Sequence, residues 1–134
     1  SHPIIVYRTM RDERVRASHA RWDGLALPID DAFWRTHYPP NGWRCRCRAY
    51  AISQSDFAAM KGTGEVKAWE APQVVTLQYR NRYTGEWTDV PAGIDPGFGY
   101  NPGQARAEAL RRLQAEKLAA LVPAIADATR RGLN

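Results

Sequence analysis

Residues 44–52, with the sequence RCRCRAYAI, alternate strictly between two kinds of side chain. Successive side chains of a β-strand point to opposite faces, so this pattern predicts a strand with two unlike faces. One face has the small residues and the other has the arginines: Cys45, Cys47, Ala49 and Ala51 against Arg44, Arg46, Arg48 and Tyr50. The fold has to accommodate a strand with one thiol-bearing face and one cationic face.

Short strand-like and helical segments make up the rest of the chain. β-branched and aromatic residues predict a strand at 4–10 and a hairpin around a Thr-Gly turn within 74–90. Helical turns are expected within 11–24, 31–38 and 55–62, with an extended piece at 25–30 and a helix from Gln104 onward. Pro123 should kink or break that last helix, because it removes a backbone donor. The predicted class is α+β, a small antiparallel sheet with short helices and a C-terminal helical segment.

Length and composition indicate one folded domain. The 134 residues suit a single modest core over about 1–100 followed by the helical segment over about 104–132. Hydrophobic residues at 44% and charged residues at 25% exclude a disordered chain. No apolar run approaches the roughly 20 residues that span a bilayer, so no membrane partner is expected. The start, SHPIIVYR, lacks the apolar centre of a signal peptide and is typical of a domain cut from a longer chain.

Positive charge is concentrated in the first 50 residues. The net charge is +5, and residues 1–50 contain nine arginines and no lysine against five carboxylates. Guanidinium groups bind phosphate or carboxylate through two parallel hydrogen bonds. Arg44, Arg46 and Arg48 share one predicted strand face and are therefore the predicted contact residues. Solubility and local ion pairs account for the same bias, so contact with nucleic acid is permitted but not shown.

The two cysteines permit a metal site. Residues two apart in a strand have Cα atoms about 6.5–7 Å apart, at the limit for a disulfide, so reduced thiols in a cytosolic setting are expected. Thiolates and imidazole suit Zn²⁺, which makes His19, Cys45 and Cys47 a candidate metal site, with His37 available as a fourth ligand. The alternative is that the cysteines are buried free thiols, which are commoner. No cofactor other than zinc is suggested.

The histidines also permit acid–base catalysis. His19 and His37 could act as acid and base in RNA cleavage near neutral pH, with Arg16 stabilising the phosphorane charge. Nothing in the sequence fixes the distance between the imidazoles, and no phosphate-binding glycine loop or nucleophile elbow is present. A non-enzymatic protein is therefore the preferred interpretation, and an RNase-type toxin is the alternative.

Several of these elements, taken in order, resemble the phage Mu F-like minor head protein domain, also called the head morphogenesis domain. The shared pattern is an Asp-Arg start, an H-x-x-x-D-G element and a proline-rich turn into C-R-C: Asp12, Arg14, Arg16, His19, Asp23, Gly24, Pro39, Pro40, Cys45, Arg46 and Cys47. The later VPAGIDPGFGYNPG and its basic helix resemble the C-terminal portion of Mu-like prophage members. The likeness covers nearly the whole chain, so residues 1–134 are expected to form a single Mu F-like domain.

The resemblance implies a minor head protein of a phage or prophage that acts in capsid morphogenesis. Its domain would dock to portal, procapsid or DNA through a basic surface. The implied partners are phage portal or capsid proteins, with DNA or RNA as further candidates. The implied location is the bacterial cytoplasm during assembly and then the virion. A toxin domain or a basic nucleic-acid-binding module remains an alternative, and the oligomeric state is open.

The chain departs from the family pattern at the candidate metal site. Many relatives have C-x-x-C before the Asp-Gly element, which with C-R-C makes a plausible four-thiolate zinc site. Here Arg16 and His19 stand at those positions. An alternative to zinc is that Arg16 pairs with Asp12 or Asp23 and joins the same two segments by hydrogen bonds. In both cases the bend that contains His19 is expected to contact the paired thiols.

Overall fold

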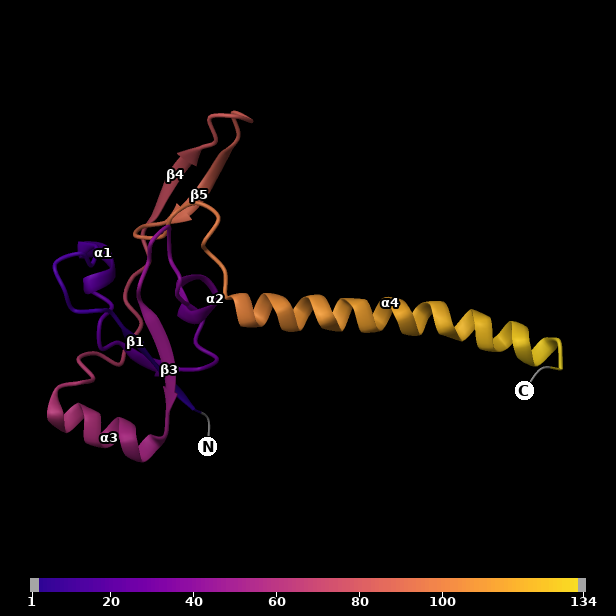
Figure 1. Cartoon of the computed structure of the whole chain (residues 1–134), viewed down its shortest axis with the longest axis horizontal. Helices are drawn as coiled ribbons and strands as arrows, with labels where there is room; N and C mark the ends of the chain where they lie inside the picture. Colours follow the sequence, from indigo (N-terminus) through magenta and orange to yellow (C-terminus); the bar gives the residue numbers. More distant parts are fainter. Residues whose placement is uncertain (1–2, 133–134) are drawn as a thin grey trace. The chain divides into compact units, whose positions relative to one another are not determined.

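A computed structural model describes residues 3–132 and divides the chain into two compact units, one ending at Asn101 and one starting at Pro102. The first unit contains eight elements: β1 (Ile4–Arg8), α1 (Ala17–Ala20), β2 (Ala26–Pro28), α2 (Phe33–His37), β3 (Arg48–Ile52), α3 (Gln54–Thr63), β4 (Thr76–Arg80) and β5 (Trp87–Pro91). The second is the helix α4 (Pro102–Arg130) (Figure 1). The predicted α+β class is confirmed. None of the described helices is both long enough and apolar enough to cross a membrane.

The strand β1 is the centre of a three-stranded antiparallel sheet with the order β2–β1–β3. Val6 of β1 lies opposite Ala26 on one side and Tyr50 on the other. Because β1 is paired along both edges, its IIVYR sequence is almost entirely buried. Pro28 ends the edge strand β2, which is a position where a strand tolerates a missing N–H group.

Apolar layers cover both faces of this sheet. One face packs into an aromatic core formed by Ile5, Tyr7, Trp22, Leu25, Leu27, Phe33, Trp34 and Ile94. The other face packs into a smaller core, in which Ile4, Val6, Ala26 and Val66 meet side chains of β3 and α3. The alternation of β1 side chains between these two cores explains why the strand reads as a continuous apolar run.

The strand β3 begins at Arg48, so the prediction of a strand over 44–47 is wrong. Arg44 has a φ of 60°, which lies in the left-handed region and is incompatible with a strand. The alternation of exposure nevertheless persists through this segment. Cys45 and Cys47 are half-buried, whereas the arginines beside them are exposed. The predicted thiol and cationic faces therefore exist without the predicted hydrogen-bonded strand.

The short helices differ from the predictions mainly in length. Within 11–24 only one turn, α1, is helical, and its first residue is preceded by Arg16, which makes no side-chain cap. The helix α3 extends the predicted 55–62 at both ends. Ser53 caps it by accepting a hydrogen bond from the Asp56 N–H group, and Gly64 ends it with a φ of 82°.

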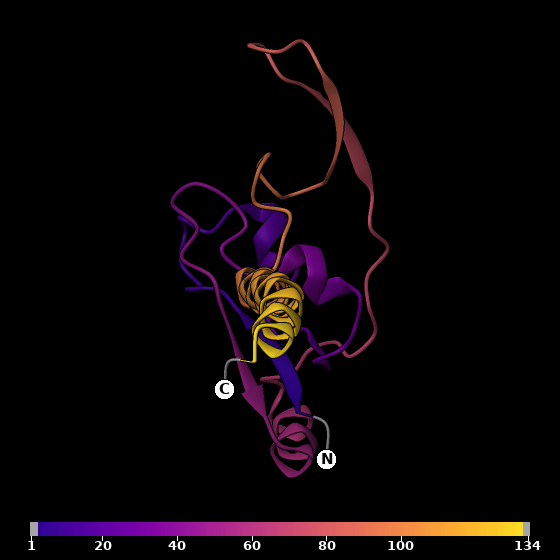
Figure 2. The ribbon, with the colours of Figure 1, turned by 90° about the vertical axis from the view of Figure 1, so that its right-hand side faces the viewer.

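The hairpin β4–β5 forms a separate two-stranded sheet, in the predicted place around the Thr-Gly turn. Asn81 organises the turn, because its side-chain oxygen accepts hydrogen bonds from the N–H groups of Tyr83 and Thr84. Figures 1 and 2 show the hairpin apart from the three-stranded sheet, joined to it by extended segments. Every residue of β4 is exposed, so the hairpin has no core of its own.

The helix α4 is continuous over 29 residues and contains Pro123 in its interior. Of the predicted kink or break at Pro123, the break does not occur, because the helix continues past the proline. A proline in a helix leaves the carbonyl group four residues earlier without its usual donor. Here that residue, Ala119, is exposed, so water can satisfy the carbonyl group and the helix can continue.

Candidate functional site

The structure brings together the three predicted metal ligands. The turn at Asn41–Gly42 directs the following segment back across α1, where His19 lies. The Nδ1 atom of His19 is 3.8 Å from the Cys45 sulfur and 3.9 Å from the Cys47 sulfur. One ligand atom from each of the three residues lies within 4.8 Å of the other two. His37, the predicted fourth ligand, is not part of this group.

A hydrogen bond from the opposite side fixes the orientation of the His19 ring. Its Nε2 atom is 2.7 Å from the Gly93 carbonyl oxygen. A carbonyl oxygen only accepts, so Nε2 has the proton and Nδ1 presents a lone pair to the two sulfurs. The ring is 2% exposed and stacks on Trp22 with a 5.4 Å centroid separation. His19 is therefore held in one orientation, with one free acceptor directed at the sulfurs.

The pKa values of the two thiols are shifted in opposite directions. A hydrogen bond from Cys47, aided by the backbone of Asn41 and Cys47, outweighs burial and lowers the pKa of Cys45. The hydrogen bond to Cys45, together with burial, raises the pKa of Cys47, although a hydrogen bond from the Tyr7 hydroxyl opposes this. Tyr7 is completely buried, and burial raises the pKa of its own hydroxyl group. At neutral pH the pair is thus expected to hold one thiolate and one thiol.

Arg16 pairs with Asp95, and not with Asp12 or Asp23 as predicted. Its guanidinium donates to an Asp95 carboxylate oxygen at 3.1 Å and to the Trp43 carbonyl oxygen at 2.6 Å. The second oxygen of Asp95 accepts from the Trp43 N–H group at 3.0 Å. A side chain at Gly42 would overlap both partners of this ion pair, which explains the glycine in the Asn-Gly turn. Arg16 joins the predicted segments, but through a carboxylate 79 positions further along the chain.

Asp23 has a structural role at the other end of α1. This buried carboxylate accepts hydrogen bonds from the backbone and hydroxyl groups of Thr9 and from the side chains of Arg11 and Lys67. Burial opposes its ionisation, but these donors outweigh burial and lower the pKa of Asp23. Gly24, with a φ of 78°, follows because a side chain there would lie 2.9 Å from the Glu65 carbonyl oxygen. The Asp-Gly element thus joins the segment after β1 to the segment around residues 65–67.

The two histidines of the RNase interpretation do not face a shared space. His37 contacts the edge of Trp22 at 5.1 Å and stacks on Phe33, while His19 stacks on the Trp22 face. The indole ring therefore contacts both imidazoles, and both are buried. Arg16 is held by Asp95. An acid and a base must both reach one substrate, and this packing does not provide such a position.

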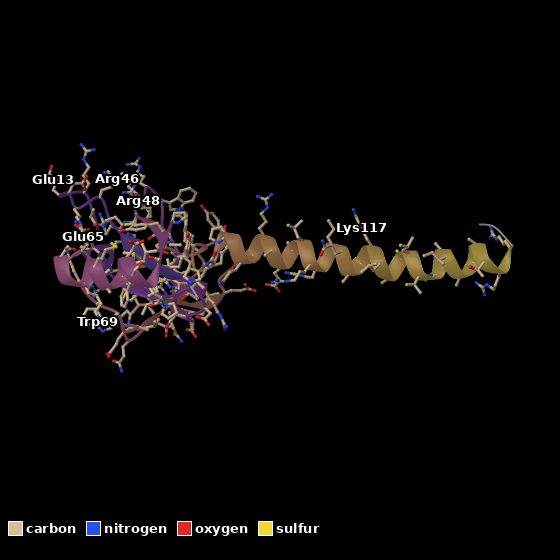
Figure 3. All side chains as sticks on the ribbon, turned by 90° about the horizontal axis from the view of Figure 1, so that it is seen from below. Glu13, Arg46, Arg48, Glu65, Trp69 and Lys117 are labelled. Carbon is tan, nitrogen blue, oxygen red and sulfur yellow. The ribbon has the colours of Figure 1, made fainter. Side chains whose placement is uncertain are left out.

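The three predicted arginine contact residues are all exposed, but only one of them forms an ion pair within the described part of the chain. Arg46 makes a two-pronged ion pair with Asp12, with N–O distances of 2.7 and 2.8 Å. Arg44 and Arg48 have no ion-pair partner within residues 3–132. In Figure 3, Arg46 and Arg48 lie on the same side of the first unit, opposite Trp69. A cavity of about 220 Å³ adjoins the thiols and is lined by Arg14, Arg16, Arg44 and Arg46.

Sequence reasoning missed the loop that closes the site. Gly93 supplies the carbonyl group for His19, Ile94 enters the aromatic core, and Asp95 binds Arg16. Gly93 has a φ of 89°, and a side chain there would lie 2.9 Å from Trp22. The available signal was the glycine- and proline-rich sequence PAGIDPG, which predicts an ordered loop but not its destination.

Comparison with known proteins decides the family. The model for the phage Mu protein F-like family matches residues 2–50. The putative capsid assembly protein F of Escherichia phage Mu is 35% identical over 114 residues, which cover 78% of this chain and 26% of that protein. The chain belongs to the Mu F-like family. The Mu-like prophage FluMu F protein of Haemophilus influenzae is 32% identical over 134 residues, covering 86% of this chain and 31% of that protein.

The Mu F-like chain spans between a quarter and a third of the length of these relatives. No solved structure matches it. The family match includes His19, Asp23, Cys45 and Cys47 but ends well before the loop at 93–95. In this member the part that matches the family model is therefore held together by a loop outside it.

Proposed function

We propose that the chain is a non-enzymatic assembly domain of a phage or prophage head. The observation that supports this most directly is its similarity to the Mu protein named as a putative capsid assembly protein. The geometry agrees with a structural role, because the motif residues stabilise the fold: Asp23 accepts hydrogen bonds from three residues and Arg16 binds a carboxylate. The domain would act in the bacterial cytoplasm during assembly and then in the virion.

The proposed partner is a portal or capsid protein of the same phage. Two exposed surfaces of the first unit suit such a partner. One is the arginine surface, defined as Arg44, Arg46 and Arg48. The other is the hairpin surface, which exposes apolar and aromatic side chains on both faces and at the turn of a short two-stranded sheet: Leu77, Tyr79, Tyr83 and Trp87. Interfaces are enriched in aromatic residues and arginine, and a patch of this kind is typical of a binding site.

The experiment is co-expression of the chain with the portal and major capsid proteins of its own phage, followed by co-purification. The proposal expects a stable complex and no RNA cleavage by the purified chain. Replacing both Arg44 and Arg48 with glutamate should weaken binding at least about tenfold, roughly 1.4 kcal/mol. The double variant Arg106→Glu and Arg111→Glu on α4 is a matched charge reversal outside the arginine surface. Turnover of RNA that is lost in His19→Ala or His37→Ala would instead support the toxin interpretation.

A DNA-binding role for the arginine surface is the second candidate, favoured by the two arginines without ion-pair partners. Each neutralised phosphate steepens the dependence of log K on log salt by about 0.9. The double glutamate variant should therefore reduce that slope by about 2 if both arginines contact phosphate. Equal binding by variant and wild type would exclude the arginine surface as the DNA site.

A further inference from the structure

The cluster of His19, Cys45 and Cys47 has the geometry of a metal site with one open position. We propose that these three residues bind one divalent cation of the zinc type, and that the fourth ligand is solvent from the arginine-lined cavity beside them. This inference is independent of the proposed function, since a zinc site would be present whatever the domain binds.

The distances fit a tetrahedral ion. Zinc binds sulfur at about 2.3 Å and imidazole nitrogen at about 2.0–2.1 Å, so tetrahedral ligands lie about 3.6 Å apart for N and S and about 3.8 Å for two S atoms. The observed N–S distances are 3.8 and 3.9 Å, and all three ligand atoms lie within 4.8 Å of one another. An ion could therefore be held after movements of no more than about an ångström.

Hydrogen bonds from surrounding groups hold each of the three proposed ligand residues in position. Metal-binding histidines usually donate their second N–H group to a carbonyl or carboxylate oxygen, and His19 donates to Gly93 in this way. The Cys47 sulfur accepts from the Tyr7 hydroxyl, and the Cys45 sulfur accepts from backbone groups. These contacts help to fix the positions of the two sulfur atoms beside His19.

Without a cation the inward-facing groups are poorly satisfied. The lone pair of His19 Nδ1 faces the two sulfur atoms, and an S–H group is at best a weak donor to it. A cation would replace that weak contact with two thiolate bonds and one imidazole bond. Thiolate and imidazole ligands together favour zinc over magnesium or calcium, which prefer oxygen.

The fourth position follows from the helical turn. Arg16 directly precedes α1, three residues before His19, and both residues line the same cavity. The Arg16 guanidinium is bound by Asp95 and the Trp43 carbonyl oxygen, and it supplies no ligand. The adjoining cavity of about 220 Å³ is lined by both residues and has room for several water molecules.

The test is a zinc titration of the reduced, metal-free chain against a competing indicator chelator. The expected result is one zinc per chain, a higher melting temperature with zinc, and thiolate-to-metal absorption when cobalt(II) replaces zinc. Cys45→Ser, which alters a half-buried side chain, should lose most of the zinc affinity. His37→Gln changes a histidine outside the cluster and should keep the stoichiometry. Circular dichroism of each metal-free variant confirms that it is folded.

A second pair of variants tests the open position. Both Arg16→Cys and Arg16→Ser remove the pair with Asp95, but only the first adds a thiol beside His19. Arg16→Cys should bind zinc at least about tenfold more tightly than Arg16→Ser. A folded, reduced wild type that binds no zinc at one equivalent would overturn the proposal, as would a Cys45→Ser variant with wild-type affinity. Equal affinity of the two Arg16 variants would place the open position away from Arg16 and so contradict the proposed ligand arrangement.

Discussion

Two glycines, Gly42 in the turn before the cysteines and Gly62 in α3, have different room for an added side chain. Gly42 lies under the ion pair of Arg16 and Asp95, where a Cβ atom would overlap both side chains. Gly62, inside α3, has no other atom within 4 Å of that position. Two glycines of one chain thus provide opposite outcomes for the same substitution.

Gly42→Ala is expected to destabilise the domain by up to about 1 kcal/mol, because the ends of the partly exposed Arg16 and Asp95 side chains must move apart to admit the methyl group. Gly62→Ala should stabilise it by about 0.4–1 kcal/mol, because alanine restricts the unfolded chain and fits the helix. Urea unfolding of both variants measures the difference. A Gly42→Ala variant stabilised as much as Gly62→Ala would mean that Arg16 and Asp95 do not pack over the turn in solution.

His37 should make stability depend on pH. Burial lowers its pKa to about 4, from 6.5 for an exposed histidine. Between pH 6.5 and about 4, His37 is therefore protonated in the unfolded chain but neutral in the folded chain. The free energy of unfolding consequently decreases as the pH falls through this range. The loss is at most about 3 kcal/mol. Urea unfolding at pH 7, 6 and 5, with a chelator present, measures this slope.

The variant His37→Phe keeps an aromatic ring against Phe33 and Trp22 but cannot titrate. Its stability should change less between pH 7 and pH 5 than that of the wild type. The carboxylates with lowered pKa values, Asp12, Asp23 and Glu65, lose their contribution only at lower pH, so they do not mask the comparison. Parallel slopes for the two proteins would assign the pH dependence to another group.

At the scale of elements, the two least buried structures are the hairpin β4–β5 and the helix α4. Isolated two-stranded sheets are marginal in water, yet this hairpin exposes Trp87 at 63% and Tyr83 at 84%. Arginines lie over both rings, with Arg80 5.9 Å from the Trp87 centroid and Arg82 5.0 Å from the Tyr83 centroid. Such contacts are worth about 0.5–1 kcal/mol at exposed sites and help to order the hairpin.

Trp87→Ala is expected to reduce co-purification with the head partner by about tenfold or more, because exposed tryptophans are frequent centres of binding energy. The melting temperature of the first unit should change little, since Trp87 lies outside both apolar cores. Trp69→Ala is a suitable control, because it removes another exposed tryptophan, one that contacts α3. A wild-type level of binding by Trp87→Ala would exclude the face of the hairpin that presents Trp87.

Pro123→Ala should strengthen α4 around residues 119–127. Proline inside a helix costs about 3 kcal/mol relative to alanine, and its removal restores a hydrogen bond to the Ala119 carbonyl group. Amide hydrogen exchange along α4 measures this, with slower exchange expected in the variant. Unchanged exchange in that region would show that the helix is already frayed beyond Pro123 in the wild type.

At the scale of the whole molecule, all residues of the two apolar cores precede Pro102. A chain truncated after Asn101 should therefore unfold cooperatively, with a melting temperature within a few degrees of that of the full chain. Thermal unfolding followed by near-ultraviolet circular dichroism reports on the buried tryptophans. A large drop in the melting temperature would show that the first unit depends on α4.

The sequence predicted the parts of the site that depend on local pattern. The alternation at 44–49 predicted which side chains are exposed, and the motif order predicted that His19 would meet the paired thiols. It did not predict Asp95 as the partner of Arg16, because a single carboxylate in a glycine-rich loop has no periodic signal. The predicted strand began too early, at Arg44 and not at Arg48, because it was inferred from alternating side chains alone. Side chains can alternate in exposure without hydrogen bonds to a neighbouring strand.

The closing loop at 93–95 also constrains when the protein can fold during its synthesis. Ile94 fills the aromatic core, and Gly93 and Asp95 bind side chains made more than seventy positions earlier. A nascent chain still attached to the ribosome has therefore synthesised its entire sheet before it can complete the interior. Until that loop emerges from the exit tunnel, the tryptophans and thiols of the first half are available to chaperones.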